Sequence, residues 1–365
     1  MIVRDEAHVI QRCLDSIQPL IDHVLIVDTG SEDGTQTLIR DWLTQHGLPG
    51  EVIEEPWRDF AYNRSHALAC LRKRTEIDFA FIMDADDMLV LEAGFDPEAF
   101  RETLISDCYN VELRQNTVRY RRILICRNRL AFRFRGVLHE FLEKPSDASG
   151  PGITAGFHVV SGREGSRNRN PEKYLKDARI LERAVTEEED PSMRSRYTFY
   201  LAQSYRDCGE AAKALEAYLQ RAALGGWKEE VFYSFYEAAR LMERLDYPAE
   251  KILRTYLEAT RAQPARAEAL HGASRYCRRH KEFEKGYHFA RYGLKLRKPD
   301  SGLFLEDWIY DYGLLDELAV NSYWAGHYRE SLETCIRLLA DRKYPDHAHS
   351  RILDNAFHAL RKLDS

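Results

Sequence analysis

Phe79-Ala-Phe-Ile-Met-Asp84-Ala-Asp86-Asp87-Met-Leu89 is an apolar run that ends abruptly in three carboxylates. A run of about five apolar residues is long enough for a strand that is buried on both faces. In open α/β sheets, ligands bind outside the carboxyl ends of such strands. Carboxylates crowded there repel one another unless a cation or a donor is present, and hard oxygen ligands favour magnesium, manganese or calcium. We therefore predict a cation-binding site at this strand end.

The overall composition is that of an ordinary globular protein. A chain of 365 residues is enough for about two or three domains. The residues are 44% hydrophobic and 31% charged, and the net charge of -6 gives no reason to expect a nucleic-acid partner. No apolar stretch approaches the ~18 residues of a membrane span, and the first residues lack the basic-then-apolar layout of a signal peptide.

The cysteines are scattered through the chain. There are seven, an odd number, and none forms a Cys-x-x-Cys pair. This pattern argues against a disulfide scaffold and against a zinc site. Reduced thiols in a cytoplasm are the simplest interpretation, so we expect a cytoplasmic protein.

Strand and helix signals alternate through residues 1–165. Apolar residues recur at helical spacing from Ile10 to Ile21, and two further helical segments separate short apolar runs at 24–27, 51–54 and 79–83. This β-α-β-α-β order predicts an α/β domain with a mostly parallel, doubly wound sheet. After Pro97 we expect shorter, mixed strands, at residues 120–127, 130–134 and 137–142.

The strand signals disappear from Asn170 onward, and paired helices follow one another. Their spacing is close to the ~34 residues of tetratricopeptide repeats. We therefore predict an all-α helical-repeat domain over 166–365, after an α/β domain over 1–165, with a polar stretch at 162–170 between them. Such repeats present concave surfaces to peptides or mediate dimers. The aromatic residues could serve either role or pack in the core, and they include Trp227, Trp308 and Trp324.

Asp28-Thr-Gly-Ser31 follows an apolar run and precedes a helical segment. It matches the Asp-Thr-Gly-Ser signature of aspartic proteases, but those sites lie in β-rich folds and need a second aspartate loop. A nucleotide pocket is the better interpretation, since Asp28 can accept hydrogen bonds from a base or ribose near the amino end of a helix. A capped turn without a ligand is the alternative.

The acidic strand end also has other interpretations. Asp84-Ala-Asp86 is similar to the motif of haloacid-dehalogenase-type phosphatases, but Met88 stands where that motif continues with Thr or Val, and two β-α units come first. A solvated acidic strand end is a further alternative.

Three more residues are candidates for chemistry. Arg64 begins a helical segment and could hold a phosphate. Glu140 follows His139 closely after a glycine and could act as a general base, although such a pair is common. His158 ends the last predicted strand of the first half, where it is either a ligand or a core residue.

Taken in order, these motifs resemble family 2 glycosyltransferases of the GT-A fold. The members of this family that the chain resembles are those with tetratricopeptide-like repeats at the carboxyl end, such as the bacteriocin S-glycosyltransferases. The motifs that carry the resemblance cover nearly the whole first half, and they are Met1 to Glu6, Val27 to Thr35, Trp57 to Arg64, Asp84-Ala-Asp86, Gly136 to Glu140, and His158. The second half resembles the family only in type.

The resemblance implies a donor site for a UDP-sugar and a divalent metal, Mn²⁺ or Mg²⁺. Asp86 and His158 would hold the metal, and Glu140, or else Asp87, would deprotonate the acceptor. The remaining donor-binding residues would be Val3, Glu6, Asp28, Arg64, Asp84, Ala85 and His139.

The implied reaction is an inverting transfer of a sugar to an acceptor, with metal-assisted departure of the diphosphate. The acceptor would be a peptide or protein side chain held by the repeats, or else a glycan or lipid-linked acceptor. A scaffold with a degenerate transferase domain is the non-enzymatic alternative, and the repeats would also suit a homodimer. The chain departs from the family by beginning inside the first strand, which implies a short or trimmed strand, and by having Ser65 where Asn is common.

Overall fold

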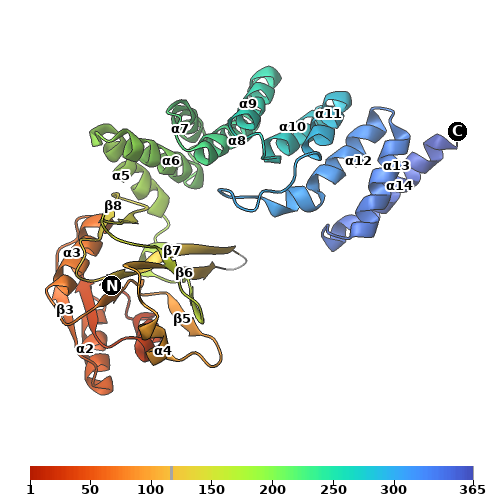
Figure 1. Cartoon of the computed structure of the whole chain (residues 1–365). Helices are drawn as coiled ribbons and strands as arrows, with labels where there is room; N and C mark the ends of the chain where they lie inside the picture. Colours follow the sequence, from red (N-terminus) through yellow and green to blue (C-terminus); the bar gives the residue numbers. More distant parts are fainter. Residues whose placement is uncertain (116–117, 365) are drawn as a thin grey trace. The chain divides into compact units, whose positions relative to one another are not determined.

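The computed structural model describes residues 1–115 and 118–364, without the side chains of Val118, Asn168 and Arg169. The chain forms two compact units, Met1–Ile180 and Leu181–Ser365 (Figure 1). Helix α5 (Lys173–Glu187) crosses this division. Its first turns belong to the first unit because Asp177 pairs with Arg167, whose guanidinium lies 4.5 Å from the centre of the Phe60 ring. The observed division is therefore later in the chain than the predicted one.

The first unit begins with the predicted β-α alternation. Strands β1 (Ile2–Val3), β2 (Val24–Asp28) and β3 (Gly50–Glu54) form a parallel sheet in the order β1-β2-β3. All five positions of β2 are buried, as its apolar sequence requires. The intervening helices are α1 (Ile10–Ile17), the short η1 (Gln18–Leu20), α2 (Thr35–His46) and α3 (Phe60–Arg72).

A second, mixed sheet follows. Its strands lie in the order β4 (Phe79–Phe81), β7 (Val118–Arg127), β6 (Cys108–Gln115), β11 (Phe157–Val160) and β5 (Met88–Leu91), with β10 (Gly152–Ile153) beside β6. Only the β6–β11 and β6–β10 pairings are parallel. The domain is thus less parallel than the sequence predicts, and its strands form two sheets because β4 pairs with β7 and not with β1.

The remaining elements of this unit are short. They are α4 (Pro97–Glu102), β8 (Arg133–Arg135), β9 (Phe141–Glu143) and η2 (Ser166–Arg169). The strand predicted at 120–127 is confirmed within β7, whereas those predicted at 130–134 and 137–142 are reduced to the β8–β9 hairpin. The main core joins α1 and α2 to the sheets through residues such as Leu14, Ile26, Ile39 and Leu113.

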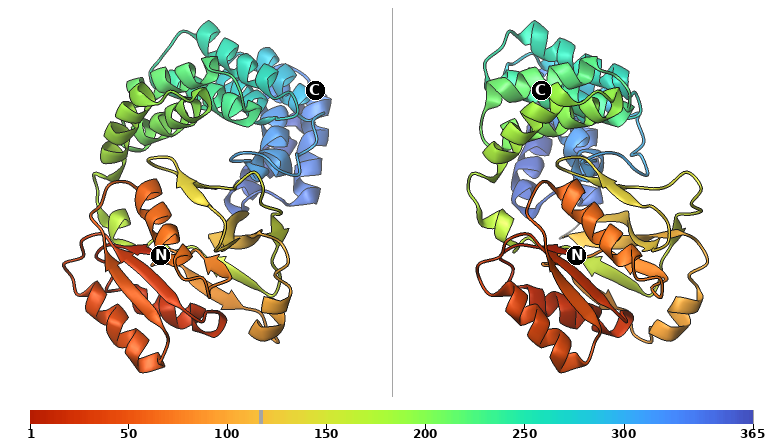
Figure 2. Two further views of the ribbon diagram at one scale, coloured as in Figure 1. Left: turned by 60° about the vertical axis from the view of Figure 1, so that its left-hand side comes forward. Right: turned by 90° about the vertical axis from the view of Figure 1, so that its left-hand side faces the viewer.

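The second unit is entirely helical, as predicted. Its antiparallel pairs follow one another from green to blue in Figure 2. The helices are α6 (Pro191–Asp207), α7 (Ala211–Ala223), α8 (Lys228–Arg244), α9 (Ala249–Ala262), α10 (Glu268–Arg279), α11 (Phe283–Gly293), η3 (Ile309–Gly313), α12 (Leu314–Trp324), α13 (Tyr328–Asp341), η4 (Asp346–Ala348) and α14 (His349–Leu363).

Equivalent turns recur between the paired helices. A residue with positive φ ends the first helix of each pair, at Gly209, Asp246, Lys281 and Gly326. A left-handed residue stops a helix and reverses the chain within a short turn. The recurrence of a left-handed residue at these turns supports the prediction of repeated helical pairs.

The described residues contain no disulfide bond and no helix suited to a membrane span. All seven cysteines are free, and five of them are buried: Cys13, Cys108, Cys126, Cys277 and Cys335. None of the helices described is both long enough and apolar enough to cross a bilayer.

His271 of α10 makes the second unit sensitive to acid. The residue is 4% exposed, and burial together with Arg275 and Arg278 lowers its pKa from 6.5 to about 3. The unfolded chain therefore binds the proton first as the pH falls. The stabilisation from neutral His271 is complete above pH 6.5 and is lost toward pH 3, at up to ~1.4 kcal/mol per pH unit.

We expect His271→Gln to show a shallower acid-induced loss of unfolding free energy than the unmodified chain over this range, measured by urea unfolding. His347 is exposed, so His347→Gln is the matched control and should follow the unmodified chain. Identical pH slopes for His271→Gln and the unmodified chain would contradict the argument.

Candidate functional site

Asp28 lies at the carboxyl end of β2 and is 1% exposed. Its Oδ1 accepts hydrogen bonds from the amides of Gly30 and Ser31, at 2.9 and 2.8 Å. Its Oδ2 is buried and has no hydrogen-bond partner among the described residues. Since buried polar atoms are nearly always satisfied, this oxygen is an acceptor left for a ligand.

Glu6 lies close to the same strand end. Val3 pairs with Asp28 in the β1–β2 ladder, and Glu6 follows in the next loop, where its amide donates to Thr35 Oγ1 at 2.9 Å. Glu6 Oε1 accepts from the amide of Ser166 at 3.1 Å, whereas Oε2 is buried without a partner in the described part of the chain. Burial raises the pKa of Glu6. The structure thus places Val3 beside Asp28 and Glu6 in the loop that follows Val3, and their role in donor binding stays a prediction.

The three acids after β4 form a tight turn. The amide of Asp87 donates to the carbonyl of Asp84 at 3.2 Å, and Ala85 between them is buried in the core. Burial, followed by the charge of Asp84, raises the pKa of the 5% exposed Asp87 to about 7. The crowding predicted from the sequence is therefore real.

Backbone amides from the segment after β11 compensate part of this negative charge. We call residues 161–166 the strap. Gly162 donates to Asp87 Oδ1 at 3.1 Å, and Gly165 donates to Asp86 Oδ2 at 3.0 Å. A Cβ on Gly162 would lie 2.1 Å from the carbonyl oxygen of Asp86, so only glycine allows this approach.

Arg64 connects the acidic turn to the loop after β8. Its Nη2 lies 2.5 Å from Asp84 Oδ1, and its Nε lies 2.8 Å from Glu140 Oε1. Burial opposes the charge on Arg64, but the two carboxylates outweigh burial and raise its pKa. Burial likewise opposes the charge on Asp84, yet Arg64 keeps the pKa of Asp84 below its usual value.

Local structure fixes the positions of Arg64 and of its partner Glu140. Helix α3 begins after Asp59, whose carboxylate accepts from the amide of Tyr62 at 2.7 Å. This cap places Arg64 in the first turns of the helix. On the other side, Gly136 and His139 take positive φ angles of 113° and 51°, and the loop turns the Glu140 side chain inward until it is only 10% exposed. His139 itself is exposed.

None of the contacts described in the structure joins His158 to the acidic turn, and its place in a metal shell stays a prediction. In the β5–β11 ladder His158 pairs with Val90, whereas Val160 pairs with Met88 beside the acids. The His158 ring lies 3.3 Å from Arg114 Nη1, and burial, followed by Arg114, lowers its pKa. The neighbours of Asp86 are instead the glycines of the strap.

Sequence reasoning missed two arginines on β7. A cavity of about 260 Å³ opens beside Asp84 and Asp87, and Arg121 and Arg122 line it together with Asn110. Its apolar lining includes Leu124, Phe134, Phe141 and Leu142. The available signal was the density of arginines in the sequence 118–127, which an ordinary solvent-facing strand would also show.

A divalent cation fits the acidic turn if a ligand supplies part of its shell. Within the described residues, no three His, Cys, Asp or Glu side chains converge as a metal site. Arg64 and Gly165 each engage one oxygen, of Asp84 and Asp86 respectively, which leaves each carboxylate a second oxygen. Mg²⁺ is commonly held by one or two carboxylates together with water and substrate phosphates. The donor set therefore suits such an ion.

Comparisons with known proteins find similar sequences and structures. Residues 1–90 match the family described as Glycosyl transferase family 2. The lipopolysaccharide core biosynthesis glycosyltransferase LpsC of Rhizobium meliloti is 30% identical over 89 residues, which are 24% of this chain and 31% of that protein. A TPR repeat-containing protein of Synechococcus elongatus is 32% identical over 152 residues, 39% of this chain and 34% of that protein.

Among solved structures, a tetratricopeptide repeat protein from Parabacteroides merdae has 15% identity and a TM-score of 0.39, over 53% of this chain and 70% of that one. The chain spans about a third of the length of the two curated relatives. The family match supports a family 2 glycosyltransferase domain at the amino end of the chain, ahead of the helical unit.

The close approach of the strap to the acidic turn is testable. We expect Gly162→Ala to lower the unfolding free energy by about 1–3 kcal/mol, because its Cβ would overlap the backbone of Asp86. Gly165→Ala is the matched variant, since its Cβ would lie 3.1 Å from the mobile end of the Asp86 side chain. Urea unfolding should rank Gly162→Ala below Gly165→Ala, and the reverse order would contradict the geometry.

Proposed function

We propose that this protein is a glycosyltransferase that moves a sugar from a nucleotide-sugar to an acceptor by inverting displacement. The observation that carries the proposal is the pairing of Arg64 with Asp84, which follows β4, and with Glu140, which lies in the loop after β8. It joins three of the motifs through which the sequence resembles the family. The same domain carries two buried carboxylate oxygens without partners, on Glu6 and Asp28.

The nucleoside would bind at the end of β2. The free oxygens of Asp28 and Glu6 are acceptors, so they select a ligand that presents N–H or O–H donors. A uracil ring N–H and ribose hydroxyls supply such donors, which supports a UDP-sugar. The backbone of Val3 borders the same region because Val3 pairs with Asp28.

The diphosphate would lie between Arg64 and the acidic turn. A bound Mn²⁺ or Mg²⁺ would supply positive charge to the leaving diphosphate, with Asp86 and the free oxygen of Asp84 as its protein ligands. Arg64 offers a fixed guanidinium to the same charge, which preorganises the site. Arg121 and Arg122 add further positive charge around the adjoining cavity, whose apolar lining would exclude water from the sugar.

Glu140 is the proposed base, with Asp87 as the alternative. The Glu140 side chain retains 10% exposure and lies beside Arg64, so it borders the site where donor and acceptor would meet. Asp87 is buried at 5% exposure and is engaged by Gly162. An acceptor therefore has a more direct route to Glu140 than to Asp87.

The helical repeats would hold the acceptor. Trp227, Trp308 and Trp324 are 56%, 41% and 62% exposed, so these three tryptophans are not buried in the core. Exposed aromatic residues are frequent anchors for a peptide or protein, which supports a side chain of a peptide or protein as the acceptor. The proposed site of the reaction is the cytoplasm. The name of the Rhizobium relative supports a glycan or lipid-linked acceptor as the second candidate.

Release of UDP from UDP-sugars in the presence of Mn²⁺ tests the proposed function. We expect a measurable rate with at least one UDP-sugar and a loss of at least about 100-fold in Asp86→Ala, because the charge on the leaving group would lose its neutralisation. Glu98→Ala removes an 85% exposed carboxylate of the same unit and serves as the control. A scaffold protein would give no release, and full activity in a folded Asp86→Ala would exclude a metal held by that residue.

Glu140→Gln and Asp87→Asn separate the two candidate bases. We expect Glu140→Gln to lower kcat by about 10²–10⁴-fold while KM for the donor changes little. Asp87→Asn keeps an oxygen for the Gly162 amide and should lower kcat by less than about tenfold. If Glu140→Gln instead raises the donor KM with kcat preserved, Glu140 positions Arg64 and is not the base.

A further inference from the structure

Strand β7 has an unpaired edge next to the acidic turn. On one side it pairs with β6 along most of its length (Figure 1). On the other side β4 covers only Ile125 to Arg127, and a hydrogen bond from the Ile82 amide to the Leu124 carbonyl, at 2.7 Å, ends the pairing. No strand of the described chain pairs with residues 119–123 on this side, and we call them the β7 edge.

The cavity of about 260 Å³ at the acidic turn lies along this edge. Its lining includes Arg121 to Leu124 on β7 and Ile82 to Asp84 at the end of β4. Arg64 lines the same cavity, and Glu140 lies against Arg64. A chain extended along the β7 edge would therefore lead into the cavity, toward the proposed base.

Three arginines on the β7 edge have no acidic partner. Arg119, Arg121 and Arg122 are exposed, and no carboxylate of the described residues lies within ion-pair distance of them. Glu112 stands opposite Arg121 in the β6–β7 ladder, but its carboxylate pairs with Arg114 at 2.6 Å. The edge therefore carries positive charge that the chain itself does not compensate.

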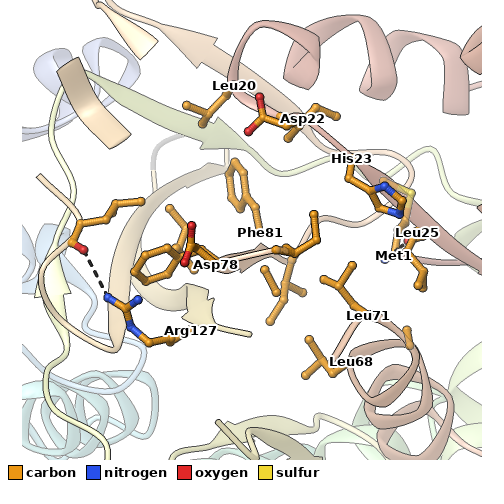
Figure 3. Close-up of a pocket in the computed structure, with 18 of the residues that line it drawn as sticks. Met1, Leu20, Asp22, His23, Leu25, Leu68, Leu71, Asp78, Phe81 and Arg127 are labelled. Atoms are coloured by element: carbon orange, nitrogen blue, oxygen red, sulfur yellow. Dashed lines mark hydrogen bonds between the residues drawn. The ribbon is translucent and has the colours of Figure 1, made fainter. Parts of the chain in front are cut away.

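Arg127, at the covered end of the same strand, shows the contrast. Its Nε lies 3.2 Å from Asp107 Oδ1, and its guanidinium lies 4.3 Å from the centre of the Phe79 ring. Its Nη2 donates to the carbonyl of Leu104, the hydrogen bond drawn in Figure 3. Unpartnered charge on β7 is thus concentrated where the strand is also unpaired.

We propose that the β7 edge binds the acceptor as an extended acidic peptide, which adds a strand to β7. The inference rests on the proposed function, since it names the acceptor of the same site. The main chain of β7 would pair with that of the peptide, and the arginines would pair with its carboxylates. The unpaired edge favours a peptide over a glycan, because a polypeptide main chain can continue a β-ladder.

The geometry also specifies where the peptide carries its charge. Arg119 and Arg121 are two residues apart and share a face of β7, so the carboxylates that meet them must alternate along the peptide. Asp84 and Asp87 line the cavity, where they would repel a further carboxylate. The residue that enters the cavity must therefore be neutral, with a hydroxyl or a thiol, and acidic residues must follow at alternate positions on one side of it.

Peptide binding to the full chain tests the proposal without any turnover. The probe is a fluorescent eight-residue peptide of one Ser followed by Thr and Glu in alternation, and its matched control has Lys in place of Glu. Fluorescence anisotropy should show at least about tenfold tighter binding of the acidic peptide, because its charge complements the edge. Arg119→Gln/Arg121→Gln should weaken this binding about tenfold or more. Arg40→Gln/Lys73→Gln removes two exposed cations elsewhere on the unit and should leave it unchanged.

Strand addition is tested separately from charge. The same acidic peptide with methyl groups on its backbone nitrogens keeps every carboxylate but loses the N–H donors that a ladder needs. We expect it to bind at least about tenfold more weakly than the unmodified peptide. Equal affinities would mean that the arginines recognise charge alone, as on a phosphorylated glycan, and would overturn the proposal.

Two further results would also overturn it. One is equal binding of the acidic and the Lys peptide, and the other is unchanged binding by Arg119→Gln/Arg121→Gln with a native circular dichroism spectrum. The arginines would then only protect the edge from pairing with other chains. A protein that releases UDP but does not bind the peptide would have another acceptor. A protein that binds the peptide but releases no UDP would overturn the proposed function, and with it the role of the peptide as acceptor.

Discussion

The pairing of one buried guanidinium with two carboxylates organises the first unit. Arg64 is 11% exposed, and it is stable there because Asp84 and Glu140 lie within ion-pair distance on two sides. Removing either partner would leave charge in a poorly solvated place. The three residues come from α3, from the end of β4 and from the loop after β8. Their pairing therefore holds together three segments that are far apart in the sequence.

The acidic turn presents the opposite electrostatic problem, since it has more negative charge than Arg64 can balance. The strap solves part of it with main-chain amides, and its glycines are required because the backbones of Gly162 and Asp86 are in direct contact. Amides neutralise less charge than a cation does, and burial together with the charge of Asp84 still raises the pKa of Asp87. A cation would therefore find a site that still attracts positive charge.

The sequence predicted those parts of the site that depend on strand order. Asp28 and Asp84 each come at the end of an apolar run, so their position at the carboxyl end of a strand was predictable. The helical pairs were predictable from the apolar spacing and the turn residues. The place of His158 could not be read, because it depends on the register of β11 against β5. The cavity that Arg121 and Arg122 line was missed for a similar reason. Only the pairing of β7 with β4 and β6 brings these two arginines beside the acids.

The buried thiols give this protein internal reporters of local opening. Cys13, Cys108 and Cys126 lie in the core of the first unit, and Cys277 and Cys335 lie in the core of the second. A buried thiol reacts with an alkylating reagent only when the structure around it opens. Because the chain carries such thiols in both units, labelling followed by peptide mapping would resolve the opening of each unit separately, without an introduced cysteine.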